Sequence, residues 1–276
     1  MILSHKATIK KEIIKLNYIM KKALFIVAIV ATALCAKAQT NIQEQYDFNR
    51  EHLTTTLEMF KADNWGSTFF FTDIYHPDKL SGPTGYYTEI ARGLNFWQNT
   101  KLGGLSAHVE WNGGQFASNA WLFGAEYFLH SSDFRYTLTL EVLYKTISGQ
   151  KALDAMDPAV RPWDKVSDVP LQFTIVWGCS DIFGLKGLTF SGFADFWWEN
   201  CAWVDPEGNT EKTSVVFISE PQLWYNIGSL FGCPNLNIGG EVEFAYNFAG
   251  GWRSDLEFHK NKGLTIAPAA GIKWNF

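Results

Sequence analysis

An all-β fold, a transmembrane antiparallel up-and-down β-barrel of about twelve strands, is what three features of this sequence predict. The first is composition, because 16% of the residues are aromatic and only 18% are charged, against about a quarter in ordinary soluble domains. The second is the alternation of apolar and polar residues along many short segments. The third is an even number of such segments, with the long connections all at one end.

The N-terminal 38 residues read as a signal peptide. Met20 and two lysines precede an apolar run over residues 23–34, and Ala36-Lys37-Ala38 supplies the cleavage site. We predict cleavage before Gln39, with Met20 as the true start and residues 1–19 as a start-site extension; a long n-region is the alternative. Residues 39–276 then form a single outer-membrane β-barrel domain.

The predicted domain is acidic, with 16 basic and 27 acidic residues after residue 38 and a net charge of −11. This balance disfavours nucleic acid as a partner. The mean hydropathy is −0.08, and beyond the N-terminal segment no apolar run reaches the roughly 18 residues of a spanning helix. A helical membrane bundle is therefore excluded.

Alternation is clearest at the end of the chain, in residues 236–248 and 264–276, where one face is apolar and the other small, polar or acidic. The predicted strands cover residues 40–48, 52–62, 65–75, 86–96, 104–112, 119–130, 134–147, 169–179, 187–199, 213–227, 235–249 and 264–276. The long connections, near 76–85, 148–168, 200–212 and 250–263, all fall at one end. A secreted β-sandwich is the alternative, but its outer face should carry more charge.

Closure follows from the bilayer, because an open sheet edge in hydrocarbon leaves backbone groups unpaired. The chain ends on Phe276, and a terminal Phe on an amphipathic strand resembles the signal that the barrel assembly machinery of the bacterial outer membrane reads. Outer-membrane lipid is the expected surrounding. Aromatic residues near strand ends are candidates for the interfacial girdles: Trp97, Trp177, Trp224 and Trp274.

A lumen of this size is narrow enough to suit one small solute. Two segments, around residues 69–73 and 193–197, each place aromatic rings and a carboxylate on one strand face. Aromatic neighbours on the second face, such as Phe70 and Phe196, leave the orientation open. The candidate lumen residues for substrate binding are Phe69, Phe71, Asp73, Phe193, Asp195, Trp197, Glu58, Glu126, Glu220 and Glu241.

In four segments the chain resembles the Tsx-like family of nucleoside-specific, channel-forming outer-membrane proteins. They are LTTTLEMFKADNWGSTFFFTD (53–73), GLTFSGFADFWWEN (187–200), EPQLWYNIGSL (220–230) and GIKWNF (271–276). The resemblance implies a monomeric twelve-stranded barrel that passes nucleosides by facilitated diffusion, with Phe69, Phe71, Asp73, Phe193 and Asp195 as lining residues. It also implies use by phages as a surface receptor.

Two other functions remain alternatives: a structural or surface-adhesion barrel with a plugged lumen, and an outer-membrane lipid hydrolase. The hydrolase needs a nucleophile beside a base, and no histidine after residue 38 lies in a His-x-Ser pattern with a neighbouring Asn. We therefore predict no enzymatic activity. The sequence predicts no cofactor and no metal site, because the acidic loop residues Asp154, Asp157, Asp164 and Asp168 match no calcium-loop spacing.

Overall fold

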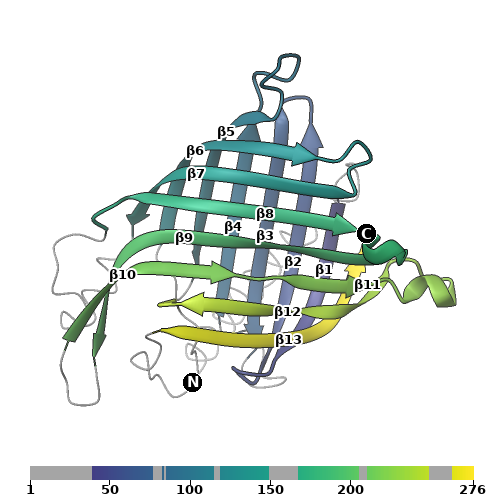
Figure 1. Ribbon diagram of the computed structural model, residues 1–276. Coiled ribbons are helices and arrows are strands. Elements are labelled where there is room, and N and C mark those ends of the chain that lie inside the picture. The colour runs from purple at the N-terminus through teal and green to yellow at the C-terminus, as the bar shows by residue number, and fades with distance from the viewer. Residues whose placement is uncertain are drawn as a thin grey trace, which may run out of the picture. The chain divides into compact units, whose positions relative to one another are not determined.

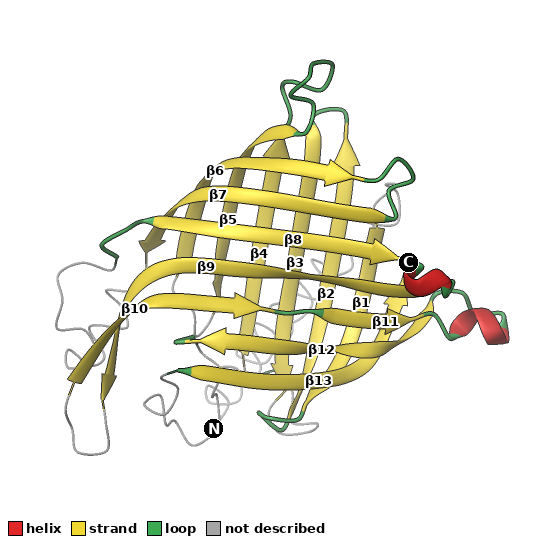
Figure 2. Cartoon of the chain, viewed as in Figure 1, coloured by secondary structure: helices red, strands yellow, loops and turns green. Residues whose placement is uncertain are grey.

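The computed structural model describes residues 39–76, 83, 85–114, 119–148, 167–204, 210–248 and 263–276. The predicted signal peptide lies outside the described residues, as does most of the predicted connections 76–85, 148–168 and 250–263. The predicted long connection 200–212 was wrong, because one strand continues to Val204 and the next begins at Thr210, and residues 201–204 pair with residues 210–213. No helix among the described residues is long and apolar enough to cross a membrane. The described strands form a single antiparallel sheet that closes on itself (Figures 1 and 2).

Thirteen strands and two short 3-10 helices make up the described fold. The first strands are β1 (Gln39–Asp47), β2 (His52–Asp63), β3 (Gly66–His76), β4 (Gly85–Leu94), β5 (Leu105–Gly114), β6 (Asn119–His130) and β7 (Tyr136–Ser148). They are followed by β8 (Leu171–Ser180), η1 (Ile182–Gly184), β9 (Leu188–Val204), β10 (Thr210–Ser219), β11 (Gln222–Tyr225), η2 (Gly228–Phe231), β12 (Leu236–Tyr246) and β13 (Leu264–Asn275).

The barrel has twelve staves, a term used here for the strand positions around its wall. The thirteen strands fill twelve positions because β10 and β11 lie end to end and both pair with β9 and β12. Every other strand pairs with its neighbours in sequence, and β13 closes the ring by pairing with both β12 and β1. The predicted fold class and strand number are thus confirmed. The interruption between β10 and β11 falls at Pro221, which has no backbone N–H to donate to a sheet ladder.

The burial pattern is the reverse of that in a soluble protein. On β6, Trp121 and Phe123 are each 46% exposed on the outer face, whereas Leu122 and Glu126 between and beyond them are buried. The same reversal holds on β13, where Ile272 is 53% exposed and points outward. A carboxylate inside and indoles outside are favourable only when hydrocarbon surrounds the barrel and polar groups line its interior. The chain is therefore a membrane-spanning barrel.

The prediction that Trp224 lies in an interfacial girdle was wrong. Trp224 is 1% exposed and lies inside the barrel, where its Nε1 donates to Gln222 Oε1 at 3.0 Å. Its register partner is Gly239, and a Cβ there would lie 2.9 Å from the indole ring, so the glycine leaves the space that the ring fills. Trp274, in contrast, is 38% exposed on the outer face. A tryptophan near a strand end therefore does not by itself indicate a girdle position.

Candidate functional site

The first aromatic segment faces the lumen from β3. Phe71 is the register partner of Glu58, whose Oε1 accepts a hydrogen bond from the buried Asn41 at 2.8 Å. Asp73 Oδ1 accepts a hydrogen bond from Thr56 at 2.5 Å, and Thr56 is buried. Because residues two apart share a strand face, Phe69 also points inward. The orientation that the sequence left open is fixed by these inward partners.

Aromatic rings continue from β3 onto β4. The ring centroids of Phe69 and Phe71 are 5.8 Å apart, and those of Phe71 and Tyr87 are 5.9 Å apart. The Tyr87 hydroxyl donates to Glu89 Oε1 at 2.6 Å, and Glu89 is the register partner of Phe71. This wall of the lumen therefore combines three rings with the carboxylates of β2, β3 and β4.

The second aromatic segment faces the lumen from β9. Asp195 Oδ1 accepts a hydrogen bond at 2.6 Å from Thr174, a buried residue of β8. Trp197, on the same face, is 3% exposed and packs against Phe193 and the apolar residues of β10. The Lys145 Nζ lies 3.9 Å from the centre of the Trp197 ring. Cationic, aromatic and acidic groups thus share this wall.

The two walls lie on nearly opposite sides of the lumen. β4 and β9 lie far apart in the ring of strands, with β5 to β8 between them on one side. Asp195 on β9 nevertheless interacts electrostatically with Tyr87 and Glu89 on β4. The carboxylates of the two segments have different charged neighbours, because Asp73 lies near Glu58, Glu241 and Glu243 whereas Asp195 lies near Glu110 and Lys145.

A second charged group surrounds Arg50, which comes from the turn between β1 and β2. Its Nη2 lies 2.6 and 2.7 Å from the two Glu243 oxygens, and its Nη1 lies 2.8 Å from Asp47 Oδ2. Burial lowers the pKa of Arg50, but Glu243 and Asp47 raise it by more, so the pKa stands above its usual value. The carboxylates of Glu220 and Glu241 also interact with this guanidinium.

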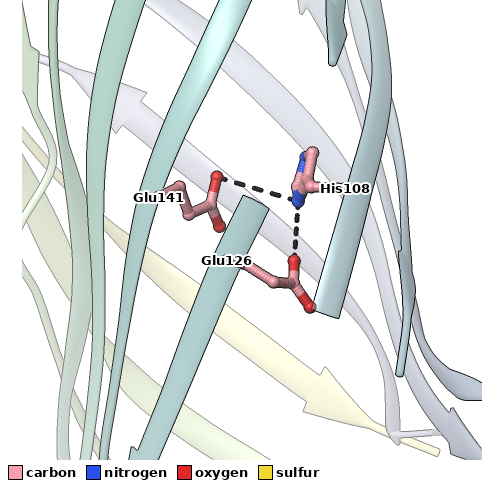
Figure 3. A group of neighbouring side chains, drawn as sticks. All are labelled: His108, Glu126 and Glu141. Atoms are coloured by element: carbon pink, nitrogen blue, oxygen red, sulfur yellow. Dashed lines mark hydrogen bonds and ion pairs between the residues drawn. The ribbon is translucent and has the colours of Figure 1, made fainter. Parts of the chain in front are cut away.

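A third group is centred on His108 of β5 (Figure 3). Its Nδ1 lies 2.6 Å from Glu126 Oε2 on β6 and 3.9 Å from Glu141 Oε2 on β7. Its Nε2 lies 3.3 Å from Glu110 Oε2, and the other oxygen of Glu110 accepts a hydrogen bond from Asn112 at 3.1 Å. Four side chains of this group, those of His108 and the three glutamates, are at least 89% buried.

All ten candidate residues named from the sequence lie on lumen-facing positions, but they fall into separate groups. Glu126 belongs to the His108 group, and Glu58, Asp73, Glu220 and Glu241 interact with the charges around Arg50. Tyr87, Glu89 and Arg50 were missed. The alternation of Tyr87 and Glu89 with polar neighbours could have indicated the first two. Arg50 lies in a turn, where no periodicity exists to reveal its direction.

The family to which the chain belongs follows from its sequence over the whole barrel. The family model described as a domain of unknown function, DUF5020, matches residues 38–276. This chain belongs to the DUF5020 family. No curated protein matches the chain significantly. The description of this family names no activity, so the nucleoside passage implied by the Tsx-like resemblance stays a prediction.

Three solved structures illustrate what the DUF5020 chain is similar to. The NanC porin is 6% identical with a TM-score of 0.49, over 86% of this chain and 100% of that one. Outer membrane phospholipase A from Escherichia coli is 10% identical with a TM-score of 0.42, over 86% and 96%. OccK10 (OpdN) from Pseudomonas aeruginosa is 9% identical with a TM-score of 0.33, over 87% and 98%.

The described histidines give no support to a hydrolase. Among them, His76 is the one whose ring nitrogen contacts a hydroxyl, with Nε2 3.0 Å from Thr55 Oγ1. The Thr55 hydroxyl also lies 2.6 Å from Glu44 Oε2, to which it donates. The carboxylate thus contacts the hydroxyl and not the imidazole, and within the described part of the chain no carboxylate is hydrogen-bonded to His76 as the acid that orients a general base. His259 lies outside the described residues.

Proposed function

We propose that this chain is an outer-membrane channel for the facilitated diffusion of a small polar solute, with nucleosides as the expected solute. The observation that carries the proposal is the pair of aromatic and acidic lumen walls, with Phe69, Phe71 and Asp73 on β3 and with Phe193 and Asp195 on β9. The aromatic walls supply flat faces and the carboxylates supply acceptors in one narrow space.

A nucleoside matches this chemistry in both of its parts. The flat base can stack on aromatic rings, and the ribose hydroxyls and exocyclic amines can donate hydrogen bonds to Asp73, Glu89 and Asp195. The excess of carboxylates in the lumen disfavours anions. We therefore expect passage of uncharged nucleosides and exclusion of nucleotides, which carry phosphate.

The remaining parts of the proposal concern the setting of the channel. We place the barrel in the bacterial outer membrane as a monomer, delivered by the barrel assembly machinery through the C-terminal strand and Phe276. A role as a phage receptor would fall to the end of the barrel that carries the long connections. These points rest on the membrane-spanning fold and on the Tsx-like resemblance.

Conductance in planar bilayers tests the proposal. The purified protein is reconstituted, and the current is recorded while adenosine, thymidine, a simple sugar and an amino acid are titrated separately. We expect saturable block by the nucleosides alone, weakened several-fold in Phe71→Ala and Phe193→Ala. The matched controls are Phe70→Ala and Phe196→Ala, which remove rings from the outer face of the same strands. A current that no solute blocks would contradict nucleoside selectivity.

A plugged structural barrel is the second candidate, because many inward side chains bind one another. On β1, Gln43 is 1% exposed and donates to Asn41 Oδ1 at 2.9 Å, and Gln45 in turn donates to Gln43 Oε1 at 3.2 Å. Such a network occupies space that a solute would need. Folded protein that inserts into the bilayer but carries no current would favour this candidate over the channel.

A further inference from the structure

His108 stands on the lumen face of β5 with a glycine on each side. Gly93 of β4 and Gly124 of β6 are its two register partners. A Cβ at Gly93 would lie 2.1 Å from Glu126 Oε1, so the missing side chain leaves the room in which the Glu126 carboxylate approaches the imidazole. The approach of Glu126 to His108 therefore depends on Gly93, and Gly124 allows the close approach of the Val142 carbonyl oxygen, 2.0 Å from the position of an added Cβ.

The carboxylates beside His108 form an unfavourable pair on their own. Glu126 and Glu141 are direct register partners on β6 and β7, and like charges directly opposite on adjacent strands destabilise a sheet. The Glu141 side chain is 8% exposed, and no described residue donates a hydrogen bond to it. Its Oε2 points toward the same nitrogen that contacts Glu126 (Figure 3). A buried carboxylate without donors needs a positive charge nearby.

Glu110 contacts the other ring nitrogen of His108, the one that does not face Glu126 and Glu141. Its Oε2 lies 3.3 Å from His108 Nε2, and Asn112 holds its other oxygen. Histidines that bind metals commonly donate the second ring N–H to a carboxylate, which fixes the tautomer. With the ring proton on Nε2, the lone pair of Nδ1 points into the space shared with Glu126 and Glu141. A metal ion there would replace the proton of the hydrogen bond that joins Nδ1 to Glu126 Oε2 at 2.6 Å.

We propose that His108 Nδ1, Glu126 Oε2 and Glu141 Oε2 bind one divalent transition-metal ion, for which Zn²⁺ is the reference. The three atoms all lie within 4.8 Å of one another. One imidazole nitrogen with two carboxylate oxygens is a set that Zn²⁺ and its neighbours accept, whereas Ca²⁺ prefers oxygen ligands alone. Two carboxylates neutralise the charge of such an ion. This site does not depend on the proposed channel function.

Calorimetric titration tests the site. The untagged full-length protein is folded in detergent, freed of metal with EDTA and titrated with Zn²⁺ and, separately, with Ca²⁺ at neutral pH. We expect one Zn²⁺ per chain, with binding lost in His108→Gln and weakened at least tenfold in Glu141→Gln, which keeps the side-chain volume. Glu110→Gln should weaken binding about 10–100-fold. The control is His130→Gln, at an exposed histidine at the end of β6.

A spectroscopic readout separates loss of ligands from loss of folding. Cu²⁺ bound to the protein should show nitrogen hyperfine coupling in its paramagnetic resonance spectrum, and this coupling should vanish in His108→Gln while the electrophoretic shift of the folded barrel is retained. The proposal fails if the unaltered protein binds no Zn²⁺, if binding is unchanged in both His108→Gln and Glu141→Gln, or if Ca²⁺ binds as tightly as Zn²⁺.

Discussion

Arg50 shows how one side chain joins two parts of the barrel that are distant in sequence. It leaves the turn between β1 and β2 and contacts both oxygens of Glu243 on β12. Its side chain is 16% exposed, and those of Asp47 and Glu243 are 7% and 12% exposed. Such a pair contributes little over an apolar alternative, but the loss of one partner leaves buried charges without compensation.

We therefore expect Arg50→Ala to lower the free energy of unfolding by about 3–5 kcal/mol. Denaturant titration of the folded barrel, followed by tryptophan fluorescence, measures the change. Arg135→Ala is the matched control, because Arg135 pairs with Asp133 in the exposed turn between β6 and β7. Because solvent screens the Arg135–Asp133 pair, its loss should leave the midpoint of denaturant unfolding unchanged. Equal effects of the two substitutions would show that Arg50 does not act through burial.

At the scale of the element, the stave formed by β10 and β11 depends on its neighbour β9. Where Pro221 interrupts the stave, the Glu220 N–H bonds the Phe193 carbonyl at 3.1 Å, and the Pro221 carbonyl accepts from the Val242 N–H at 3.1 Å. Gly192 lies beside this interruption with a φ of 152°. A Cβ there would lie 2.3 Å from the Glu220 carbonyl oxygen. The glycine thus permits the close approach that keeps the interrupted stave in the sheet.

Gly192→Ala should lower the free energy of unfolding by about 2–3 kcal/mol, because it adds both backbone strain and a clash with the neighbouring strand. Gly184→Ala is the control, since Gly184 has a φ of 74° but no atom within 4 Å of the position of an added Cβ. It should cost only the left-handed strain, about 1 kcal/mol. Thermal or denaturant unfolding of both variants measures the difference. If Gly184→Ala were as destabilising as Gly192→Ala, contact with the Glu220 carbonyl would not be the cause.

At the scale of the whole molecule, the connections at the end of the barrel that holds the turn between β2 and β3 form an apolar rim. Each of the five connections between β2 and β3, β4 and β5, β6 and β7, β8 and β9, and β11 and β12 carries a large exposed ring. These residues are Trp65 (66% exposed), Phe96 (62%), Phe134 (59%), Phe183 (90%) and Phe231 (76%). Because the rings surround the end of the barrel, the headgroup boundary of the membrane is the surface that they can all reach.

The fluorescence of Trp65 should therefore be quenched by lipids that are brominated near the headgroups. We expect Trp65→Phe to reduce the quenched part of the tryptophan fluorescence of the reconstituted barrel. Trp197→Phe, at a lumen position that is 3% exposed, should remove only fluorescence that these lipids do not quench. If Trp65→Phe removed only unquenched emission, the rim would lie in water.

The end of the chain leads to a prediction about assembly. Phe276 is 53% exposed and follows β13, the strand that closes the barrel against β1 and β12. Phe276→Ala should reduce the amount of folded barrel in cells several-fold while leaving folding from urea into detergent unchanged. Ile272→Ala, at an outward position 53% exposed on the same strand, is the control. The heat-dependent shift in electrophoretic mobility measures both. Equal loss in cells and in detergent would indicate a defect of stability and not of assembly.

The sequence by itself determined the fold class, the number of staves and the facing of the regular strands. A strand has a period of two, so the alternation along residues 119–130 or 264–276 already separates the lipid face from the lumen face. Where both faces carry aromatic residues, as around Phe71 and Phe196, this signal disappears. There only the register with Glu58 and Phe173 decided which rings point inward.

The tertiary structure alone decided which groups meet inside the barrel. Closure of the sheet brings Arg50 to Glu243, which is 193 positions away in the chain. Alternation reports the side of a strand but not its height or its neighbour across the lumen. Those depend on the order and register of all the strands, so the sequence predicted an acidic, aromatic lumen and only the folded barrel showed how its groups combine.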